Sequence, residues 1–467
     1  MKFGLEKCNT LNIKGGKLAD PSNVTLSDNI TIKSLDENEQ YKYLGLKQQL
    51  SINDSELKKE YETSFLKRLH MILNTELNAK NKIRAINSWV IPLLSYTFGI
   101  ISWSKTDIVN LNRKVRTTLT RYRSHHIHSA TERLYLPRSE GGRGLIDLES
   151  MFAKQIEKYR TYFMNKRSEL YEQLRKEDKF TPLHLTSSTF NLPAYRTKQQ
   201  LKEDLESGTM KGKYPKSLYH DSNIDKKLSV GYLTDGYLMS ETEGFLHAIQ
   251  DQVMKTRNYI KFIMKKSIPT VMCRLCNKTT ESIQHLSSGC SFLARHEYTN
   301  RHDLVGNIIH QELLKNIRKS NKTSMPHYLY KPLAVEENEE HKIYWNMYII
   351  TEHKVIHNKP DILYFNLKEK SASIVDVTIP LDENINTAYM NKIVKYEDLK
   401  RQVKNMYNLN NVNILPIVIS TNGLVHKNTR ENIKTLKISS PDFIVKKCQK
   451  SVILSTTSML RKILSEE

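Results

Sequence analysis

The chain has 467 residues, a length that suits about three domains, and its 39% hydrophobic content is sufficient for packed cores. It carries 72 lysine and arginine residues against 50 acidic ones, a formal net charge of +22. Such an excess attracts polyanions, nucleic acid above all, and disfavours a module that binds only proteins. The most apolar window, residues 89–103, is 15 residues long and contains Pro92 and Gly99. It is too short to span a bilayer, and we expect a buried helix there.

Cysteine usage and the first residues indicate a reducing compartment. Three of the five cysteines crowd into residues 273–290, which is typical of a metal cluster and not of a disulfide framework. The first seven residues lack the apolar core of a signal peptide. No lipidation signal favours an anionic membrane as the partner. We therefore predict a nuclear or cytosolic protein that contacts DNA and RNA and no membrane.

Residues 1–50 are predicted to form short strands and turns. Residues 8–14 are β-prone, Gly15 and Gly16 mark a turn, and further β-prone pieces lead to residues 41–45. Template-directed polymerisation requires paired aspartates that hold two metal ions, and the sequence contains no Asp-Asp pair. The chain as it stands is therefore not expected to polymerise.

A helical pattern replaces the strands over residues 51–175. Apolar residues recur there at a spacing of three to four. The first run comprises Leu57, Tyr61, Phe65, Leu69, Ile72 and Leu73, and the second comprises Ile83, Ile86, Val90, Leu93 and Leu94.

The same region contains a strongly basic stretch. Five cations and no acid fall within eleven residues, namely Arg113, Lys114, Arg116, Arg121 and Arg123. A helix this basic favours contact with a phosphate backbone, although a solvated basic face has the same composition. His125, His126 and His128 follow without a nearby cysteine or acid, so they are weak candidates for a metal cluster. The glycine-rich residues 136–145 lack the Lys-Ser/Thr ending of a phosphate-binding loop, and nucleotide hydrolysis is not implied.

Residues 176–239 are polar and weakly periodic, and we interpret them as a linker or peripheral region. A helix resumes at Ser240, where the run Ser240-Glu241-Thr242-Glu243 is similar to a capping box. The apolar positions that continue to Ile263 indicate ordinary helical packing.

Residues 240–319 also contain four soft metal ligands with the spacing C-x2-C-x8-H-x4-C, namely Cys273, Cys276, His285 and Cys290. Four such ligands suit tetrahedral Zn²⁺ and leave no position for a water, so we predict a structural site. His296 and His302 are alternatives to His285. Arg274 is a candidate contact to phosphate or to a single strand. The alternative is that this knuckle only braces two domains.

Residues 320–340 are predicted as a linker and residues 341–467 as the last domain. Two β-rich runs, residues 362–367 and 373–379, flank a charged turn, which is typical of a hairpin. Asp361 lies at the mouth of the first strand and Asp376 lies inside the second. A carboxylate buried in a strand requires a compensating cation, and we expect Mg²⁺, with backbone donors as the alternative.

A basic helix with Lys392, Lys395 and Lys400 is predicted after the hairpin, then a strand at residues 412–419 and further helices. This combination suits phosphodiester hydrolysis. Acidic oxygens hold Mg²⁺, the metal polarises the phosphate and activates a water, and a lysine stabilises the developing charge. Glu352 and Glu397 are further candidate ligands.

The last domain resembles the PD-(D/E)xK nucleases, with Asp361 and Asp376 in the positions of the catalytic metal ligands. It departs from the simplest pattern because Thr378 occupies the usual place of the lysine. In the nucleases of non-LTR retrotransposons of the restriction-like-endonuclease class, that lysine is displaced onto the following helix. Lys395 is similar to the displaced lysine, and Lys392 is the alternative.

The resemblance to these retrotransposon proteins extends over nearly the whole chain. Residues 4–8 and 43–45 are similar to segments that follow the catalytic core of a reverse transcriptase, so residues 1–50 resemble the tail of its palm and residues 51–175 its helical thumb. The resemblance implies a multidomain α+β protein with a residual palm segment, a thumb, a CCHC zinc knuckle and a C-terminal α/β restriction-endonuclease-like domain.

The activity that this resemblance implies is metal-dependent nicking of target DNA, which primes reverse transcription of the element's RNA. The chain is then the C-terminal portion of such a reverse transcriptase and endonuclease. A rival from another class is a catalytically dead or co-opted zinc-containing nucleic-acid-binding protein. It has the same charge and zinc site and does not cut DNA.

Overall fold

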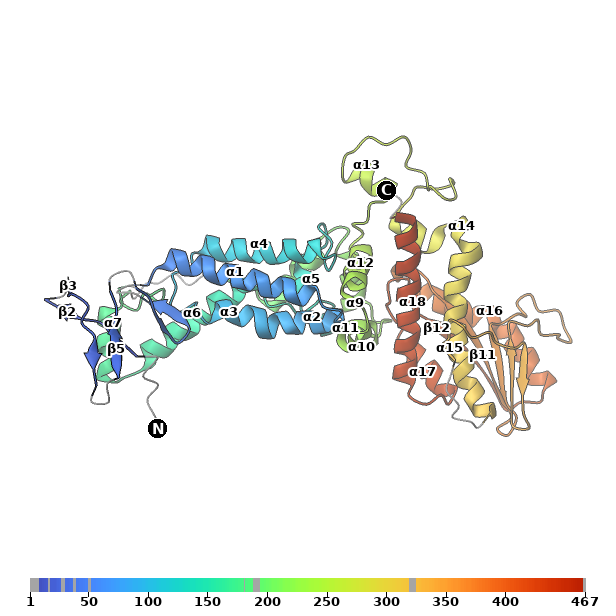
Figure 1. Cartoon of the computed structure of the whole chain (residues 1–467). Helices are drawn as coiled ribbons and strands as arrows, with labels where there is room; N and C mark the ends of the chain where they lie inside the picture. The colour runs from blue at the N-terminus through green and yellow to red at the C-terminus, as the bar shows by residue number, and fades with distance from the viewer. Residues whose placement is uncertain are drawn as a thin grey trace. The chain divides into compact units, whose positions relative to one another are not determined.

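The computed structural model describes residues 8–464 except residues 16, 27–29, 37–38, 49–51, 180, 188–193 and 319–324. Residues 4–7 of the predicted palm motif and residues 320–324 of the predicted linker therefore lie outside the described residues. The chain divides into two compact units (Figure 1). Unit 1 comprises residues 1–74, 85–116 and 146–196, and unit 2 comprises residues 75–84, 117–145 and 197–467. Helices and small sheets together confirm the mixed α+β class.

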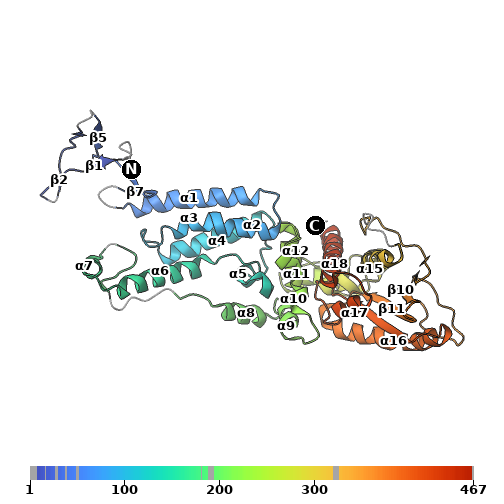
Figure 2. The same cartoon turned by 90° about the horizontal axis from the view of Figure 1, so that it is seen from below.

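Unit 1 combines short strand pairs with a group of helices. Its strands are β1 (Asn9–Thr10), β2 (Ile13–Lys14), β3 (Lys17–Leu18), β4 (Val24–Thr25), β5 (Thr31–Ser34), β6 (Tyr41–Tyr43) and β7 (Leu46–Gln48). Its helices are α1 (Asp54–Leu73), α3 (Ile91–Ser95), the greater part of α4 (Lys105–Arg121), α6 (Leu148–Asn165) and α7 (Glu169–Glu177), with a π-helical turn at Ile86–Val90. Figures 1 and 2 both show α1, α3, α4 and α6 side by side.

The predicted apolar stripes explain these helices. The Asn53 side chain accepts a hydrogen bond from the Glu56 backbone N–H at 3.3 Å and caps α1. The buried residues of α1 recur on one face and confirm the first stripe, namely Leu57, Phe65, Leu69 and Leu73. The apolar window at residues 89–103 contains the short helix α3, with Ile91 and Leu94 buried. None of the described helices combines the length and the apolar character needed to cross a membrane.

Unit 2 begins with short helices. They are α2 (Ala79–Ala85), α5 (Glu132–Tyr135), α8 (Lys198–Ser207), α9 (Lys213–His220), α10 (Lys226–Ser229), α11 (Gly231–Asp235), α12 (Ser240–Gln250), α13 (Arg257–Phe262) and α14 (Ser291–Leu293). Helices α8 to α11 lie in the later part of the region that we expected to be a linker, between residues 198 and 235. They bury apolar side chains such as Leu205, Tyr214 and Leu233, so residues 197–239 belong to the core of unit 2, while residues 176–196 belong to unit 1.

Five strands form one sheet in unit 2. They are β8 (Val335–Glu337), β9 (His341–Trp345), β10 (Ile362–Asn366), β11 (Ser371–Thr378) and β12 (Asn411–Val418), in the order β12–β11–β10–β9–β8. All neighbours are antiparallel except β11 and β12, which are parallel and are joined by α16 (Ile385–Met406). Parallel strands need such a crossover. The predicted hairpin, the helix after it and the next strand are confirmed.

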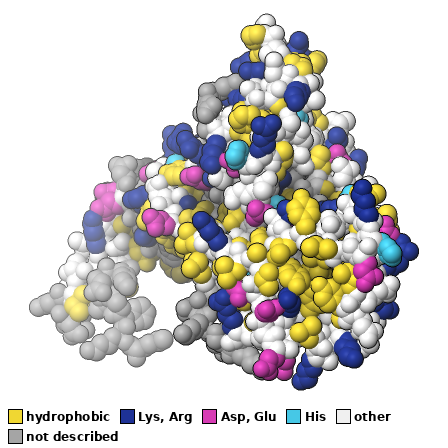
Figure 3. Space-filling view, turned by 90° about the vertical axis from the view of Figure 1, so that its right-hand side faces the viewer, with side chains coloured by type: hydrophobic (Ala, Val, Ile, Leu, Met, Phe, Trp, Pro, Cys, Tyr) yellow, Lys and Arg dark blue, Asp and Glu magenta, His cyan; other side chains and the backbone are white. Residues whose placement is uncertain are grey.

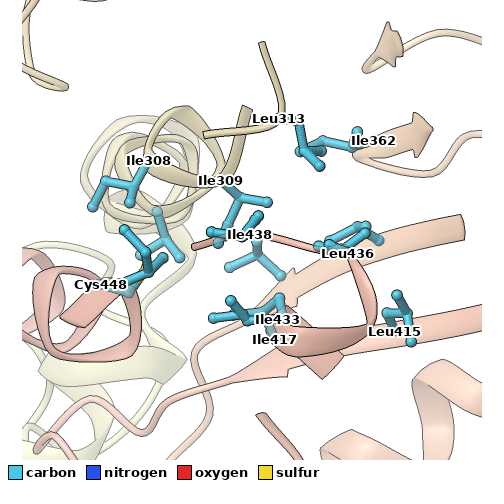
Figure 4. Packing of buried hydrophobic residues seen from close by; sticks show 14 of the residues in the cluster. Ile308, Ile309, Leu313, Ile362, Leu415, Ile417, Ile433, Leu436, Ile438 and Cys448 are labelled. Atoms are coloured by element: carbon cyan, nitrogen blue, oxygen red, sulfur yellow. The ribbon is translucent and has the colours of Figure 1, made fainter. Parts of the chain in front are cut away.

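Helices cover both faces of this sheet (Figure 2). Helix α16 packs on one face, and α15 (Thr299–Arg318), α17 (Thr429–Thr435) and α18 (Pro441–Leu464) pack on the other. Successive side chains of β11 alternate between the two cores, with Val375 and Val377 beside α15 and α18 and Ile374 beside α16. Asp376 therefore lies on the α16 face. Figure 4 shows the core under α15 and α18, where Ile308, Ile309 and Cys448 meet Ile417 from β12.

Gly306 sets how closely α15 approaches the sheet. A Cβ at this position would lie 2.5 Å from Cη2 of the Trp345 ring on β9. Replacing Gly306 by alanine is expected to cost about 1–3 kcal/mol of stability through overpacking, although alanine in an open helical site is favourable by about 1 kcal/mol. Calorimetric unfolding of Gly306→Ala, compared with Asn300→Ala at an exposed position of the same helix, checks this. A stabilised Gly306→Ala would contradict the packing.

Candidate functional site

The four predicted zinc ligands come together in unit 2. The ligand atoms of Cys273, Cys276, His285 and Cys290 all lie within 4.8 Å of one another. The sulfurs of Cys273 and Cys290 are 3.9 Å apart, and Cys276 Sγ is 3.3 Å from His285 Nε2. Thiolates at about 2.3 Å from a tetrahedral zinc ion lie about 3.8 Å from each other. The geometry and the soft donor set fit zinc.

The knuckle is attached to the C-terminal helix α18. Cys273 and Cys290 are buried in one cluster with Met459, Leu460 and Ile463. The Arg274 guanidinium donates to both Glu281 oxygens at 2.9 Å and to the Ile463 carbonyl oxygen at 3.2 Å. We predicted that Arg274 contacts nucleic acid. In the structure its guanidinium donates hydrogen bonds to Glu281 within the knuckle and to α18.

Two cysteines of the knuckle differ in the acidity of their thiols. Burial raises the pKa of Cys273 to about 11. Burial acts in the same direction on Cys276, but hydrogen bonds from the Lys278 backbone N–H and from His285 outweigh it and lower the pKa of Cys276 to about 6. Since zinc binds thiolates, Cys276 is more readily available to a metal at neutral pH than Cys273.

The two predicted catalytic aspartates lie near the same end of the hairpin. The pairing of β10 with β11 begins with Ile362 opposite Val375, Asp361 directly precedes β10, and Asp376 is the next residue of β11. A side chain of α15 contacts the Asp361 carboxylate, whereas side chains of α16 contact Asp376. The backbone N–H of Val377 donates to Asp361 Oδ2 at 2.7 Å, which holds that carboxylate beside the second strand.

His302 lies at Asp361 and not at the zinc ligands. Its Nε2 is 2.9 Å from Asp361 Oδ2, and its Nδ1 is 3.0 Å from Asp303 Oδ1. Burial disfavours the charged imidazole, but the hydrogen bonds to Asp303 and Asp361 outweigh it and raise the pKa of His302 to about 10. Burial likewise opposes ionisation of Asp361, and the His302 partner nevertheless lowers the pKa of this carboxyl group. The alternative of His302 as a zinc ligand is therefore wrong.

Asp376 is enclosed by side chains of α16. Its side chain is only 2% exposed, and the Tyr396 hydroxyl donates to its Oδ1 at 2.5 Å. Lys392 Nζ forms an ion pair with Asp376 Oδ2, and Lys395 Nζ lies 3.8 Å from Oδ1 and donates to the Tyr396 hydroxyl at 2.8 Å. Both candidate lysines therefore reach Asp376, with Lys392 the nearer.

Sequence reasoning missed Tyr396 and the role of His302. The signal for Tyr396 was present, because Lys392, Lys395 and Tyr396 are spaced i, i+3 and i+4 and share one helical face. Burial and the neighbouring Asp376 raise the pKa of the Tyr396 hydroxyl, so it remains a donor. The two further acidic candidates have other surroundings. Glu397 pairs with Lys400 at 3.0 Å, and Glu352 is exposed in the loop between β9 and β10.

The predicted basic stretch lies on α4 and just after it. Arg113, Lys114, Arg121 and Arg123 are exposed, and Arg116 is half-buried. Lys114 forms an ion pair with Glu62 of α1. Among the described residues, the four knuckle side chains form a group of metal-ligating residues that lie close together. His125, His126 and His128 do not form such a group.

Apolar side chains are exposed on the loop that leads to Asp361 and on α16. In the loop from β9 to Asp361, Ile350 is 87% exposed and Ile356 is 84% exposed, and Val394 of α16 is 71% exposed. Figure 3 shows hydrophobic side chains gathered on this side of the molecule, with lysines and arginines at the margin. Exposed apolar groups of this extent are typical of interaction surfaces.

Comparison of the chain with protein-family models and with curated proteins finds no match.

The geometry of the four knuckle ligands predicts that the protein binds one metal ion. Purified protein is expected to contain one zinc ion per chain by mass spectrometry of the metal, and Cys290→Ser is expected to lose it and to unfold at a lower temperature. Cys448→Ser, a buried α18 cysteine outside the knuckle, is the matched control and should keep the metal. Retention of stoichiometric zinc by Cys290→Ser would contradict the ligand set.

Proposed function

We propose that this chain is the C-terminal portion of a retrotransposon-encoded reverse transcriptase and endonuclease of the restriction-like class, and that its own chemistry is metal-dependent nicking of target DNA. One observation carries the proposal. Asp376 of β11 meets two lysines from the following helix, Lys392 and Lys395, and Asp361 directly precedes the neighbouring strand β10. The element order of hairpin, helix, parallel strand and helix is the order that the family resemblance implies.

The donor set suits a hard divalent cation. Asp361 and Asp376 offer carboxylate oxygens, and Mg²⁺ is commonly held by one or two carboxylates while it keeps several waters. Asp376 Oδ2 is buried without a hydrogen bond and is met only by the Lys392 ammonium group, so the site already places positive charge at this oxygen. Bound Mg²⁺ would polarise the scissile phosphate and lower the pKa of an attacking water.

The chain's own residues have separate tasks in this proposal. Tyr396 and the Val377 N–H fix the orientations of Asp376 and Asp361, respectively, by hydrogen bonds to one oxygen of each. Lys395 is 32% exposed and Lys392 22%, so Lys395 is the more available to the charge that develops on a phosphate. Lys392 neutralises Asp376 until a metal does so. His302, held positively charged, positions Asp361.

The rival reading is a zinc-containing nucleic-acid-binding protein without catalysis. The exposed cations of α4 and the knuckle support it as well as they support the nuclease. It assigns no role to an aspartate buried beside two lysines, which is costly for a protein that only binds. Divalent-ion-dependent cutting therefore distinguishes the two functions.

Removal of the Asp376 charge is the first test. The purified chain is expected to convert supercoiled DNA to the open circle in the presence of Mg²⁺, and Asp376→Asn is expected to abolish this conversion because a metal ligand is lost. Asp398→Asn, an exposed acid on α16, is the control and should nick normally. Equal nicking by Asp376→Asn and the unsubstituted protein, or no nicking by either, leaves the binding protein as the better account.

The two lysines are expected to behave differently. Lys395→Ala should lower the nicking rate by about 10²–10³ at saturating Mg²⁺ through lost charge stabilisation. Lys392→Ala should instead change the Mg²⁺ concentration needed for half-maximal rate, because the metal no longer displaces an ion pair from Asp376. Rates measured over a Mg²⁺ titration separate these effects, and a dominant rate loss in Lys392→Ala would reverse the two roles.

A further inference from the structure

A groove of about 800 Å³ lies within unit 2, and neither the knuckle ligands nor Asp361 and Asp376 line it. Its walls are α12, the C-terminal half of α18 and the segment that follows α4. Its volume falls within the range of about 300–1,000 Å³ that is usual for ligand sites. One face of α18 lines it, since Leu454, Thr457, Ser458 and Arg461 are spaced i, i+3, i+4 and i+7.

Gly244 of α12 fixes the walls close together. A Cβ at this position would lie 2.5 Å from the Ser124 carbonyl oxygen and 3.0 Å from the Arg123 carbonyl oxygen. Arg123 lies two residues after the end of α4 and has a φ of 53°, a left-handed conformation that costs a residue other than glycine about 1–2 kcal/mol. The fold therefore places an exposed arginine at the mouth of the groove, at a position where glycine would fit with less strain.

Positive charge dominates this groove. Arg123, Arg461 and Lys462 line it, with Glu241 as the acidic residue among its lining. Burial, followed by the nearby charges of His128, Lys255 and Lys211, lowers the pKa of His126 on the same wall to about 4. Lys211 and Lys255 therefore add to the positive charge near the groove.

The floor of the groove is apolar and partly aromatic. It is formed by Ile127, which is 69% exposed, with Phe245 and Met254. The Arg461 guanidinium lies over the Phe245 ring at 5.1 Å from its centroid and donates to Thr242 Oγ1 at 3.2 Å. Nucleic-acid bases stack on aromatic rings and on arginine guanidinium groups of this kind, where apolar surface lies beside them.

We infer that this groove binds a segment of single-stranded nucleic acid, with phosphates on Arg123, Arg461 and Lys462 and a base against Phe245. The inference rests on the proposed nucleic-acid function but not on catalysis. The phosphates of a duplex would also pair with these cations, but its bases are stacked on each other and cannot contact the apolar floor. An acidic peptide offers a ring to the floor only where it carries an aromatic residue, whereas every nucleotide carries a base, and the surplus of 22 positive charges in the chain favours the more highly charged polymer.

The test uses the full chain and fluorescence anisotropy with labelled oligo(dT). The double variant Arg123→Ala, Arg461→Ala is expected to weaken binding about tenfold or more and to reduce the salt slope of log K by about 1.4, which is two phosphate contacts on a single strand. The matched control Lys434→Ala, Lys437→Ala removes the same charge from exposed positions and should change binding little. Equal effects of the two double variants would overturn the inference.

Phe245→Leu tests the base contact without a change of charge. It is expected to weaken oligo(dT) binding about 5- to 100-fold and to leave binding of an abasic oligomer of the same length unchanged. An equal loss for both oligomers, or displacement of oligo(dT) by poly-glutamate at equal charge concentration, would overturn the inference, the latter in favour of an acidic protein partner. Zinc content and unfolding temperature show that each variant is folded.

The same measurements on Asp376→Asn separate the groove from the nuclease. That variant is expected to bind oligo(dT) as tightly as the unsubstituted chain. If no protein nicks DNA while the groove variants still lose single-strand binding, the endonuclease proposal fails and the groove assignment stands. If nicking depends on Asp376 but the groove variants bind normally, the groove assignment fails and the endonuclease proposal stands.

Discussion

The burial of one carboxylate in the middle of a sheet constrains the rest of the C-terminal region. Asp376 sits in β11 between two valines of the opposite core and is almost completely enclosed. An ionised carboxylate in such a place needs hydrogen bonds and a counter-charge. Tyr396 and Lys392 supply them from α16, one helical turn apart, so the crossover helix must present this face to the sheet. The sheet order and the helix register therefore support the same site.

Helix α18 connects this sheet to the zinc knuckle within unit 2. Its first half packs with α15 and α17 through Val445 and Cys448, and its last turns pack against Cys273 and Cys290. One rigid helix of 24 residues thus takes part in two cores. Zinc is then expected to stabilise more than the knuckle, because ordering of the ligand loops also orders the end of α18. The third feature on this helix is the groove, which is lined by α18 residues, Leu454 and Arg461 among them, that belong to neither core.

Local patterns in the sequence were sufficient for the parts of the fold that depend on local order. The stripe of α1, the hairpin and the spacing of the zinc ligands follow from residues close to each other in the chain. The sequence was insufficient where distant residues pair. Glu243 was interpreted as part of a capping box, yet it is fully buried and accepts hydrogen bonds from Arg138 and Arg143, about one hundred residues earlier. His302 and Asp361, 59 residues apart, are a second case.

These distant pairs also bear on the meaning of the net charge. Arg133 pairs with Asp251 at 2.7 Å and Arg143 pairs with Glu243 at 2.8 Å, all four side chains being 1% exposed or less. Because each of these two arginines is matched by a buried acid, the two pairs add nothing to the charge seen by a partner. The surplus positive charge is therefore carried by residues nearer the surface, among them the exposed cations of α4 and the groove. That distribution favours a polyanion as the partner, whether or not Asp361 and Asp376 take part in cutting DNA.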